Sequence, residues 1–379
     1  MTLKQAFIKV GYWRLATFVI ALLAVPLITL RPDFTRVESR FEIWHVFDMW
    51  ANFDGQHYLD IADYWYGVFP HTDKNYAFFP IYPALIRGVN LITQNSLLSG
   101  LIISNLAFVF ALFYLFKLLK LDYSTKISNL TVLVLLFFPT SFFFGSYYTE
   151  SVFLLISVLV FYLARQGKFL PAAFMALIGS ATRITGVFLW PALALEFYLY
   201  YGKDIKKLFN PEAIWLILPP LGLLSYVKYQ FQKTGDALYF ITSQPAFGAG
   251  RTVDKIILIH QVLFRYAKML IFVDHSSTLF FSVLLESLSG VGFLALIIYG
   301  LKKLRISYLV YVTLSFFLPT FTGTFSSMPR YVMVLFPLFA LFATVLEKAP
   351  KQLYKAYFII SSILAIITIA LFTRGYFIG

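Results

Sequence analysis

The sequence has no cysteine and few charged residues. With no Cys among its 379 residues, disulfide bonds and thiolate metal sites are excluded. Only 13% of the residues are Asp, Glu, Lys or Arg, against roughly 25% in a soluble globular chain. Hydrophobic residues make up 60%, and several of their runs reach the ~20 residues that a helix needs to cross a bilayer. A soluble fold is therefore excluded, and membrane-spanning helices are the predicted architecture.

Acidic residues are the scarcer charge, with 18 Asp and Glu against 31 Lys and Arg and a formal net charge of +13. The basic residues occupy short runs between apolar runs, which is the pattern of cytoplasmic loops and not of a nucleic-acid surface. Nucleic acid is therefore not an expected partner. Lys4, Lys9 and Arg14 precede the first apolar run, and no small-residue cleavage site follows near Pro26. This run is predicted to be an uncleaved first span.

About eleven spans are predicted. They are placed at residues 11–30, 97–116, 129–146, 150–164, 169–182, 184–200, 213–231, 279–300, 306–322, 331–347 and 354–373. Two other apolar stretches, 76–92 and 256–273, contain prolines or charged residues. They are predicted to be re-entrant or interface-lying helices. If both were spans, the topology between them would invert.

Orientation follows from the basic residues. From a cytoplasmic N-terminus, alternating spans put basic residues on every inner connection, as the positive-inside rule requires. The inner residues are Lys4, Lys9, Arg14, Lys117, Lys120, Lys126, Arg165, Lys168, Lys203, Lys206, Lys207, Lys302, Lys303, Arg305, Lys348, Lys351 and Lys355. We therefore expect the polar loops between the other span ends to face outward.

Two large outer loops are expected, at residues 31–75 and 232–278. The first holds eight of the 18 acidic residues: Asp33, Glu38, Glu42, Asp48, Asp54, Asp60, Asp63 and Asp73. A connecting loop of this length and polarity points to function. No soluble domain or convincing internal repeat is evident, so residues 1–379 are predicted to be a single transmembrane domain.

Asp54 lies at a break between two amphipathic helical patterns, 41–50 and 58–64. One interpretation is a helix cap that accepts backbone N–H groups near Gln56 or His57. The other is a catalytic base at the membrane surface, because one carboxylate within hydrogen-bond reach can remove a proton from an acceptor hydroxyl. His57 is either part of the same polar cluster or an ordinary satisfied histidine. Asp60 and Asp63 fit a solvated helix face.

Three further charged residues lie at or near outer span ends. Glu150 is either a charge favoured at a helix start or a site residue. Arg183 is flanked by apolar residues on both sides, and an ionisable residue at membrane depth is a functional hypothesis by default. Arg330, followed by Tyr331, opens the penultimate span, where the helix dipole opposes a cation. Arg330 is interpreted as a phosphate ligand or as a side chain that extends to the head groups.

Five short motifs follow one another along the chain. They are FDGQHY at 53–58 with Ile61 and Ala62, YAFFPIYP at 76–83, Phe138-Pro139-Thr140 with 147–151, ATRITG at 181–186, and Pro329-Arg330-Tyr331 with Phe336-Pro337. Together they resemble the GT-C superfamily of polyprenyl-phosphate-sugar glycosyltransferases. Within it they resemble the PIG-V family, which is related to glycosylphosphatidylinositol mannosyltransferase 2. The resemblance covers most of the chain.

The resemblance implies an all-α GT-C membrane fold and an inverting mannosyl transfer. The donor would be mannose on a polyprenyl or dolichyl phosphate, and the acceptor a hydroxyl of a lipid, glycan or protein. Asp54 matches the base of the first outer loop. Arg330 and Arg183 are expected to bind the phosphate, and His57, Glu150 and Tyr331 the substrates. Asp54 has no adjacent second acid, so a divalent metal is not supported and no cofactor is predicted.

The resemblance also implies a multi-pass protein among membrane lipids, in the cell membrane of a prokaryote or the endoplasmic reticulum of a eukaryote. The active site would face the non-cytoplasmic side. The main alternative is a transporter or flippase of lipid-linked sugars. It requires charged residues along a path through several spans, and Arg183 is nearly the only deep candidate. A non-catalytic partner in a glycosylation complex is the other alternative, and it has no need of Asp54.

Overall fold

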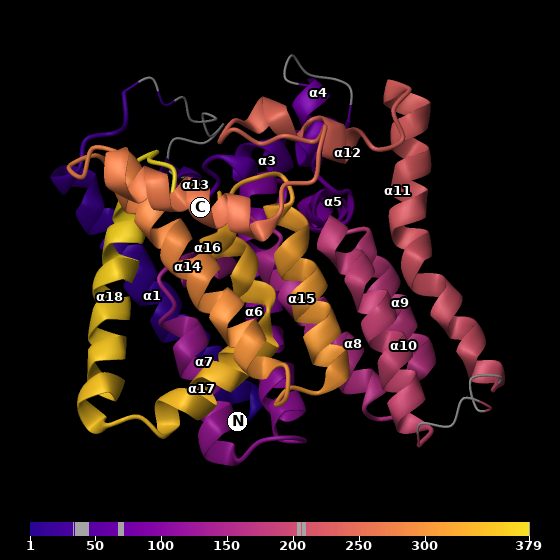
Figure 1. Ribbon diagram of the computed structural model, residues 1–379. Coiled ribbons are helices and arrows are strands. Elements are labelled where there is room, and N and C mark those ends of the chain that lie inside the picture. Colours follow the sequence, from indigo (N-terminus) through magenta and orange to yellow (C-terminus); the bar gives the residue numbers. More distant parts are fainter. Residues whose placement is uncertain (33, 35–44, 67–71, 203–205, 207–209, 379) are drawn as a thin grey trace.

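The computed structural model describes residues 1–32, 34, 45–66, 72–202, 206 and 210–378. These residues form helices, turns and loops, and no strand occurs among them. Figure 1 shows a bundle of long helices with short helices gathered at one end. We call this the cavity end, where α3 (Asp54–Tyr64), α5 (Ile81–Thr93) and α13 (Ile259–Phe272) lie. The opposite end, which holds the N-terminus, is the basic end.

Each predicted span coincides with a helix or with a helix interrupted by 3₁₀ turns. In chain order they are α1 (Leu3–Leu27), α6 (Ser96–Leu119), α7 (Thr125–Leu136) with η2 (Ser141–Gly145), α8 (Glu150–Ala164), α9 (Phe169–Ser180), η3 (Ile184–Phe188) with α10 (Leu189–Tyr200), η5 (Pro211–Ile217) with α11 (Leu218–Thr234), α14 (Thr278–Gly300), α15 (Ile306–Thr320), α16 (Met328–Tyr331) with η7 (Val332–Val334) and α17 (Phe336–Glu347), and α18 (Lys351–Thr373). The all-α membrane architecture is confirmed.

Not every predicted span is long enough to cross a bilayer as one straight helix. Among the described residues, α1, α6, α14 and α18 are long and apolar enough, and the pair of Met328–Val334 and Phe336–Glu347, bent by 89°, makes a fifth candidate. Five shorter apolar helices of 10–17 residues accompany them. The number of spans therefore stays a prediction.

Proline explains why several helices end earlier than predicted. The span expected at 129–146 ends as an α-helix at Leu136, because Pro139 cannot continue the backbone hydrogen bonding. Pro319 similarly lies in the last turn of α15. The bend before α17 falls at Leu335, two residues before Pro337. These breaks supply the irregular segments from which part of the cavity end is built.

The two large loops contain the short helices that the sequence predicts. The first loop forms α2 (His45–Asp48), α3 and α4 (Thr72–Asn75), and the second forms α12 (Tyr239–Thr242), η6 (Gln244–Phe247) and α13. The stretches 76–92 and 256–273 become α5 and α13, neither of which is among the apolar helices that are candidates for spans. Asp33, Glu38 and Glu42 lie outside the described residues.

The basic connections gather at the basic end. Figure 1 shows the α6–α7, α8–α9, α14–α15 and α17–α18 connections there, together with the N-terminus. This is the arrangement expected from the positions of the lysines and arginines, of which Lys203 and Lys207 fall outside the described residues. Which side of the membrane this end faces stays a prediction.

Arg14 corrects one part of that prediction. It lies in the middle of α1, and its guanidinium carbon is 4.0 Å from the ring centroid of Trp50, a residue of the first loop. Arg14 is therefore not part of the basic end. A cation–π contact stabilises a cation that the interior would otherwise disfavour.

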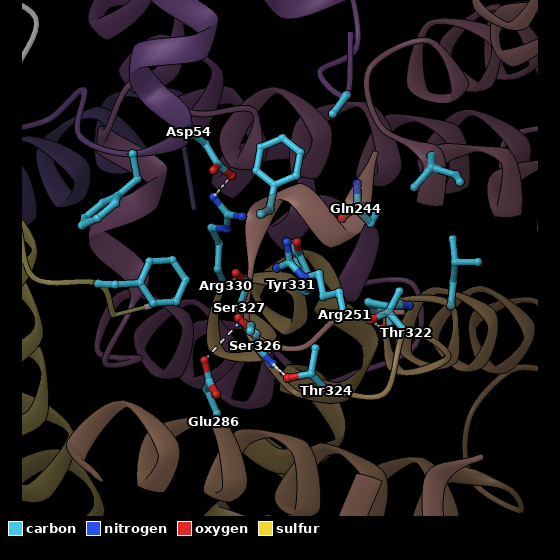
Figure 2. Close-up of a pocket in the computed structure, with 18 of the residues that line it drawn as sticks. Asp54, Gln244, Arg251, Glu286, Thr322, Thr324, Ser326, Ser327, Arg330 and Tyr331 are labelled. Carbon is cyan, nitrogen blue, oxygen red and sulfur yellow. Dashed lines mark hydrogen bonds and ion pairs between the residues drawn. The ribbon is translucent and has the colours of Figure 1, made fainter. Parts of the chain in front are cut away.

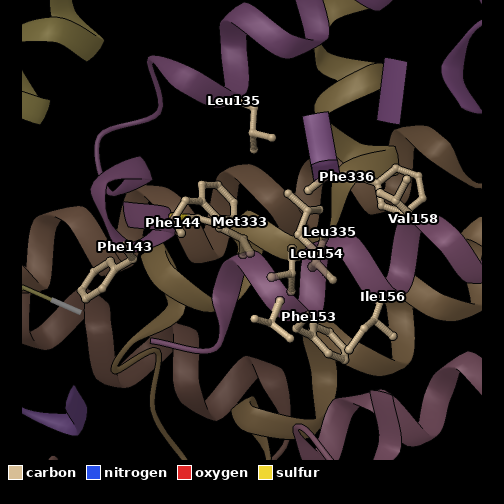
Figure 3. Close-up of a cluster of buried hydrophobic side chains, with 14 of the residues drawn as sticks. Leu135, Phe143, Phe144, Phe153, Leu154, Ile156, Val158, Met333, Leu335 and Phe336 are labelled. Carbon is tan, nitrogen blue, oxygen red and sulfur yellow. The ribbon is translucent and has the colours of Figure 1, made fainter. Parts of the chain in front are cut away.

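Helix α8 lies at the centre of the bundle. It packs against α6, α9, α10 and η7. Figure 3 shows the buried apolar side chains around it, among them Phe153 and Leu154 of α8, Phe144 of η2 and Phe336 of α17. These side chains are 0% exposed. The first residue of this well-packed helix, Glu150, is thereby fixed at the cavity end.

Candidate active site

Asp54 is the first residue of α3, and it does not cap that helix. The N-cap position belongs to Phe53, and no side chain there accepts a capping hydrogen bond. Phe53 has φ 57° and ψ −118°, a left-handed backbone that costs a non-glycine residue about 1–3 kcal/mol. Its ring contacts Phe34, Phe372 and Phe377, with centroids 5.2–5.8 Å apart. This packing holds the turn that presents the Asp54 carboxylate.

The start of α3 is docked closely on the segment before α8. The Tyr148 hydroxyl donates to the Asn52 carbonyl at 2.7 Å, and the Tyr147 N–H donates to the Trp50 carbonyl at 2.9 Å. A Cβ on Gly55 would come within 3.3 Å of the Tyr147 carbonyl oxygen. The small residue after Asp54 therefore permits an approach that brings Asp54 near Glu150.

Two carboxylates and two arginines form a chain of ion pairs. Arg330 Nη1 donates to Asp54 Oδ2 at 2.6 Å, and Arg183 Nη1 donates to Glu150 Oε1 at 2.9 Å. Arg330 Nε lies 3.6 Å from the same Glu150 oxygen and joins the two pairs. The Glu150 and Arg330 side chains are only 2% and 6% exposed, whereas Asp54 is 29% exposed. Asp54 is thus the member of the chain that a substrate can reach most easily.

Local structure places both arginines. Arg183 has an extended backbone between α9 and η3, and the turn after it needs glycine, because a Cβ on Gly186 would lie 2.0 Å from the Gly179 carbonyl oxygen. Arg330 lies in α16, whose Pro329 carbonyl accepts a hydrogen bond from Thr140 at 2.7 Å. The Arg330 side chain points to Asp54, so it does not extend toward lipid head groups.

The surroundings of Asp54 set its protonation state. Burial raises the pKa of the Asp54 carboxyl, but the charge and hydrogen bond of Arg330 lower it, and the nearby His57 and Arg251 lower it further. The balance leaves the pKa below its ordinary value. Asp54 is therefore an ionised carboxylate at neutral pH, able to accept a hydrogen bond or a proton.

Asp54 lies on the wall of a cavity of about 910 Å³. Figure 2 shows Asp54 and Arg330 bonded to each other there, with Tyr331, Arg251 and Ser327 close by. All six residues predicted for the site line this cavity: Asp54, His57, Glu150, Arg183, Arg330 and Tyr331. An apolar part of the wall is formed by Met269, Leu279, Val283, Leu318 and Phe321. The cavity can therefore take a ligand with both a charged and an apolar part.

His57 and Tyr331 are both held in place by their neighbours. His57 Nδ1 lies 2.8 Å from Asn75 Oδ1, and its ring stacks on Phe78 at a centroid distance of 4.6 Å. The Tyr331 ring lies 5.3 Å from the guanidinium carbon of Arg330 and 5.5 Å from that of Arg183. The structure thus brings together residues from motifs that are far apart in the sequence.

Two residues of the site were not predicted. Arg251 of the second loop and Glu286 of α14 also line the cavity. Glu286 accepts hydrogen bonds from the Tyr266 hydroxyl at 2.6 Å and from the Ser327 N–H at 3.4 Å. An acid inside a predicted span was the signal for Glu286, by the same rule that singled out Arg183. Glu286 and Arg14 also correct the prediction that Arg183 is nearly the only deep ionisable residue.

The site carboxylates do not present a metal site. Among the described residues no group of three or more His, Asp or Glu side chains converges to hold a metal ion. Asp54 and Glu150 bond arginines instead. This donor set does not fit a divalent cation.

No protein-family profile matches the sequence, and no curated protein matches it either. Solved structures do match the fold. The structure of ArnT from Cupriavidus metallidurans bound to undecaprenyl phosphate superimposes with a TM-score of 0.51 at 12% identity, over 95% of this chain and 64% of ArnT. The Archaeoglobus fulgidus oligosaccharyltransferase in the apo form gives a TM-score of 0.48 at 15% identity, over 97% of this chain and 56% of that one.

The chain thus spans a little under two thirds of the length of ArnT and just over half that of the oligosaccharyltransferase. At 12% identity the likeness to ArnT concerns the fold. It agrees with the apolar helices of the bundle and with the fold that the motifs predict. The chain is an integral membrane protein with the GT-C fold.

Proposed function

We propose that this protein is an inverting glycosyltransferase. It transfers a sugar, for which we propose mannose, from a polyprenyl-phosphate donor to a hydroxyl acceptor. One observation carries the proposal: an ionised, partly exposed Asp54 is held by Arg330 on the wall of a cavity that has both charged and apolar sides. The fold of ArnT, whose solved structure holds undecaprenyl phosphate, supports the class of donor. Mannose rests on the motif resemblance.

The proposed reaction is a single displacement. Asp54 accepts the proton of the acceptor hydroxyl as its oxygen attacks the anomeric carbon. The new bond from oxygen to carbon forms while the bond from that carbon to the phosphate oxygen breaks. The departing oxygen keeps the electron pair, and the products are the glycosylated acceptor and a polyprenyl phosphate. One base suffices for this chemistry, and inversion follows from attack opposite the leaving group.

The other site residues are given roles around that displacement. Arg330 orients Asp54 and, with Arg183, offsets the negative charge that grows on the departing phosphate. Glu150 holds both arginines in place through one oxygen. His57 and Tyr331 provide polar groups for the sugar or the acceptor. We further propose that the cavity end faces away from the cytoplasm.

A labelled-donor assay tests the proposal. The full-length protein in liposomes receives polyprenyl-phosphate [³H]mannose and a membrane lipid extract, and parallel samples receive polyprenyl-phosphate glucose or a nucleotide-linked mannose. We expect label to move to a new product only from a polyprenyl-phosphate donor. Transfer from the nucleotide sugar would contradict the donor class. Movement of the labelled donor across the bilayer without any product would instead identify a flippase.

A further inference from the structure

The cations that line the cavity differ in whether they have a partner within the protein. Arg330 bonds Asp54, and Arg183 bonds Glu150. Arg265 donates to the carbonyl oxygens of residues 249, 250 and 323 at 2.9–3.2 Å. Among the described residues, the guanidinium of Arg251 has no hydrogen bond and no ion pair. Arg31 and Lys255 on the cavity wall also lack such a partner within the described part of the chain, but they are exposed, whereas Arg251 is half-buried and has its donors free for a ligand.

The loop that carries Arg251 is a built structure. Gly248, Ala249 and Gly250 have φ of 74°, 55° and 59°, and such a backbone is strained for the non-glycine Ala249. Arg265 holds it through hydrogen bonds to the Ala249 and Gly250 carbonyls, and a third bond ties Arg265 to the Gly323 carbonyl. After Arg251, the Thr252 N–H donates to the Thr322 carbonyl at 3.0 Å. The second loop is thereby fixed to the end of α15, and the position of Arg251 with it.

The side chain of Arg251 faces the reacting groups. Its positive charge acts on the Asp54 carboxylate, on the Tyr331 hydroxyl and on Glu286. In Figure 2, Arg251 extends from its loop toward Tyr331, with Arg330 and Asp54 beyond. The positive charges of Arg330 and Arg183 act on the same Tyr331 hydroxyl. The three arginines thus lie near Tyr331, and of the three only Arg251 donates no hydrogen bond to a carboxylate of the described residues.

A guanidinium without a protein partner can bind an anionic ligand. Arg251 is half-buried, and a cation that has lost part of its hydration gains from an anionic partner. The planar fork of arginine fits two phosphate oxygens at once. The carboxylates near Arg251 are engaged elsewhere, Asp54 by Arg330 and Glu286 by Tyr266.

We propose that Arg251 is the main ligand of the substrate phosphate, on the opposite side of that group from Arg330. The ligand is a phosphate monoester or diester, carried by a polyprenyl lipid or free in solution. This rests on the proposed function for the identity of the lipid, but not for the binding itself. The arginines then have different roles: Arg251 donates hydrogen bonds to the phosphate, while Arg330 holds Asp54 and contributes its charge.

Equilibrium binding to the full-length protein in nanodiscs tests the assignment. The probes are a fluorescent short-chain polyprenyl phosphate, the matching polyprenol without phosphate, and inorganic phosphate as competitor. We expect Arg251→Ala to weaken binding of the polyprenyl phosphate by about ten- to a hundredfold and to leave polyprenol binding unchanged. Arg251→Lys should lie between, because it keeps the charge without the fork. Competition by inorganic phosphate in the wild type, lost in Arg251→Ala, would show that the group binds without its lipid.

Lys268→Ala is the matched control, since Lys268 is an exposed base of the same loop that does not line the cavity. Its binding should equal that of the wild type. Arg251→Ala should also keep the wild-type denaturation midpoint, because its guanidinium bonds nothing among the described residues. Unchanged polyprenyl-phosphate binding in Arg251→Ala, or an equal loss for polyprenol, would overturn the assignment. The proposed function has a separate outcome: it fails if no sugar is transferred, whatever the variant binds.

Discussion

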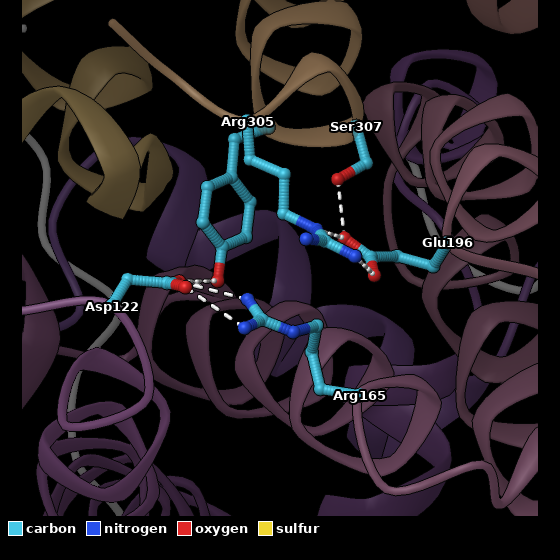
Figure 4. A network of polar contacts seen from close by, with 6 residues as sticks. Asp122, Arg165, Glu196, Arg305 and Ser307 are labelled. Atoms are coloured by element: carbon cyan, nitrogen blue, oxygen red, sulfur yellow. Dashed lines mark hydrogen bonds and ion pairs between the residues drawn. The ribbon is translucent and has the colours of Figure 1, made fainter. Parts of the chain in front are cut away.

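Two ion-pair clusters lie at opposite ends of α8, and they are built differently. At the basic end, Arg165 donates two hydrogen bonds of 2.8 Å to Asp122. Arg305 donates two of 2.7 and 2.8 Å to Glu196, which also accepts one from Ser307. Figure 4 shows that both oxygens of each carboxylate accept a hydrogen bond from an arginine. At the cavity end each pair of arginine and carboxylate has a single hydrogen bond.

The cavity cluster also leaves buried polar atoms open. Glu150 Oε2 and Arg330 Nε have no hydrogen-bond partner within the described residues, although buried polar groups are normally bonded. Both clusters contain a carboxylate that is almost fully buried, so burial does not separate them. The clusters differ in how many of their polar atoms have hydrogen-bond partners. At the basic end both oxygens of each carboxylate are bonded, which suits a structural role, whereas the cavity cluster has polar atoms left to bond a ligand.

Asp54→Asn should produce the largest effect on activity. Asparagine keeps an oxygen for Arg330 but cannot take the proton, so the transfer rate should fall by about 10²–10⁴-fold. The denaturation midpoint in detergent should stay close to that of the wild type. Single-turnover transfer of labelled sugar measures the rate. A wild-type rate in this variant would remove Asp54 as the base.

Glu196→Gln should produce the converse result at the basic end. The change leaves Arg305 with a neutral partner in a nearly buried position and should lower the free energy of unfolding by about 3–5 kcal/mol. The transfer rate per folded molecule should not change. Thermal denaturation and activity measured on the same preparation separate the two quantities. A lower transfer rate with unchanged stability would mean that the basic-end cluster has a functional role, and the proposed difference between the two clusters would be wrong.

Arg330→Gln tests the electrostatic part of the cavity cluster through pH. In the wild type Arg330, together with His57 and Arg251, keeps the pKa of Asp54 below its ordinary value against the effect of burial, so transfer should persist as the pH falls to about 5. Without that cation, the effect of burial is less opposed and the pKa of the Asp54 carboxyl rises. The acid limb of the rate profile should then move to higher pH. Arg330→Lys keeps the charge, and its acid limb should stay near that of the wild type.

Asp122→Asn should have the smallest effect. The Asp122 and Arg165 side chains are 27% and 15% exposed, and partly solvated pairs contribute only about 1 kcal/mol. We expect a small drop in the denaturation midpoint and full activity. A loss of stability as large as that of Glu196→Gln would mean that the two pairs of the basic end act as one unit.

The sequence predicted the bundle well, because the apolar runs and basic connections are local signals. It overestimated helix lengths where Pro139 stops a run, and it assigned Arg14 to the wrong place. That error has a physical cause: the fold of the first loop brings Trp50 onto Arg14, and nothing near Arg14 in the sequence records the contact.

The site was predicted only as a set of residues. Each motif signalled a polar group where an apolar one was expected, but the Asp54–Arg330 bond joins residues 276 positions apart. No local sequence pattern predicts that these two residues are in contact. Nor could local sequence decide whether Asp54 or Phe53 is the N-cap of α3. No sequence pattern marked Arg251. It stands out only in the folded protein, where, among the described residues, Arg330 and Arg183 bond carboxylates and Arg251 does not.

The length of α8 has a consequence for where the reaction takes place. Its 15 residues rise by about 22 Å, whereas the hydrocarbon core of a bilayer is about 30 Å thick. Glu150 and Arg165 bound this helix, so the two charged clusters cannot both reach the lipid head groups in an undeformed bilayer. Either the lipid thins around the protein, or at least one of the two clusters lies below the head-group plane. Bilayer thickness therefore bears on the proposed transfer, and the acyl-chain length of the lipid sets how deep in the membrane the proposed acceptor binds.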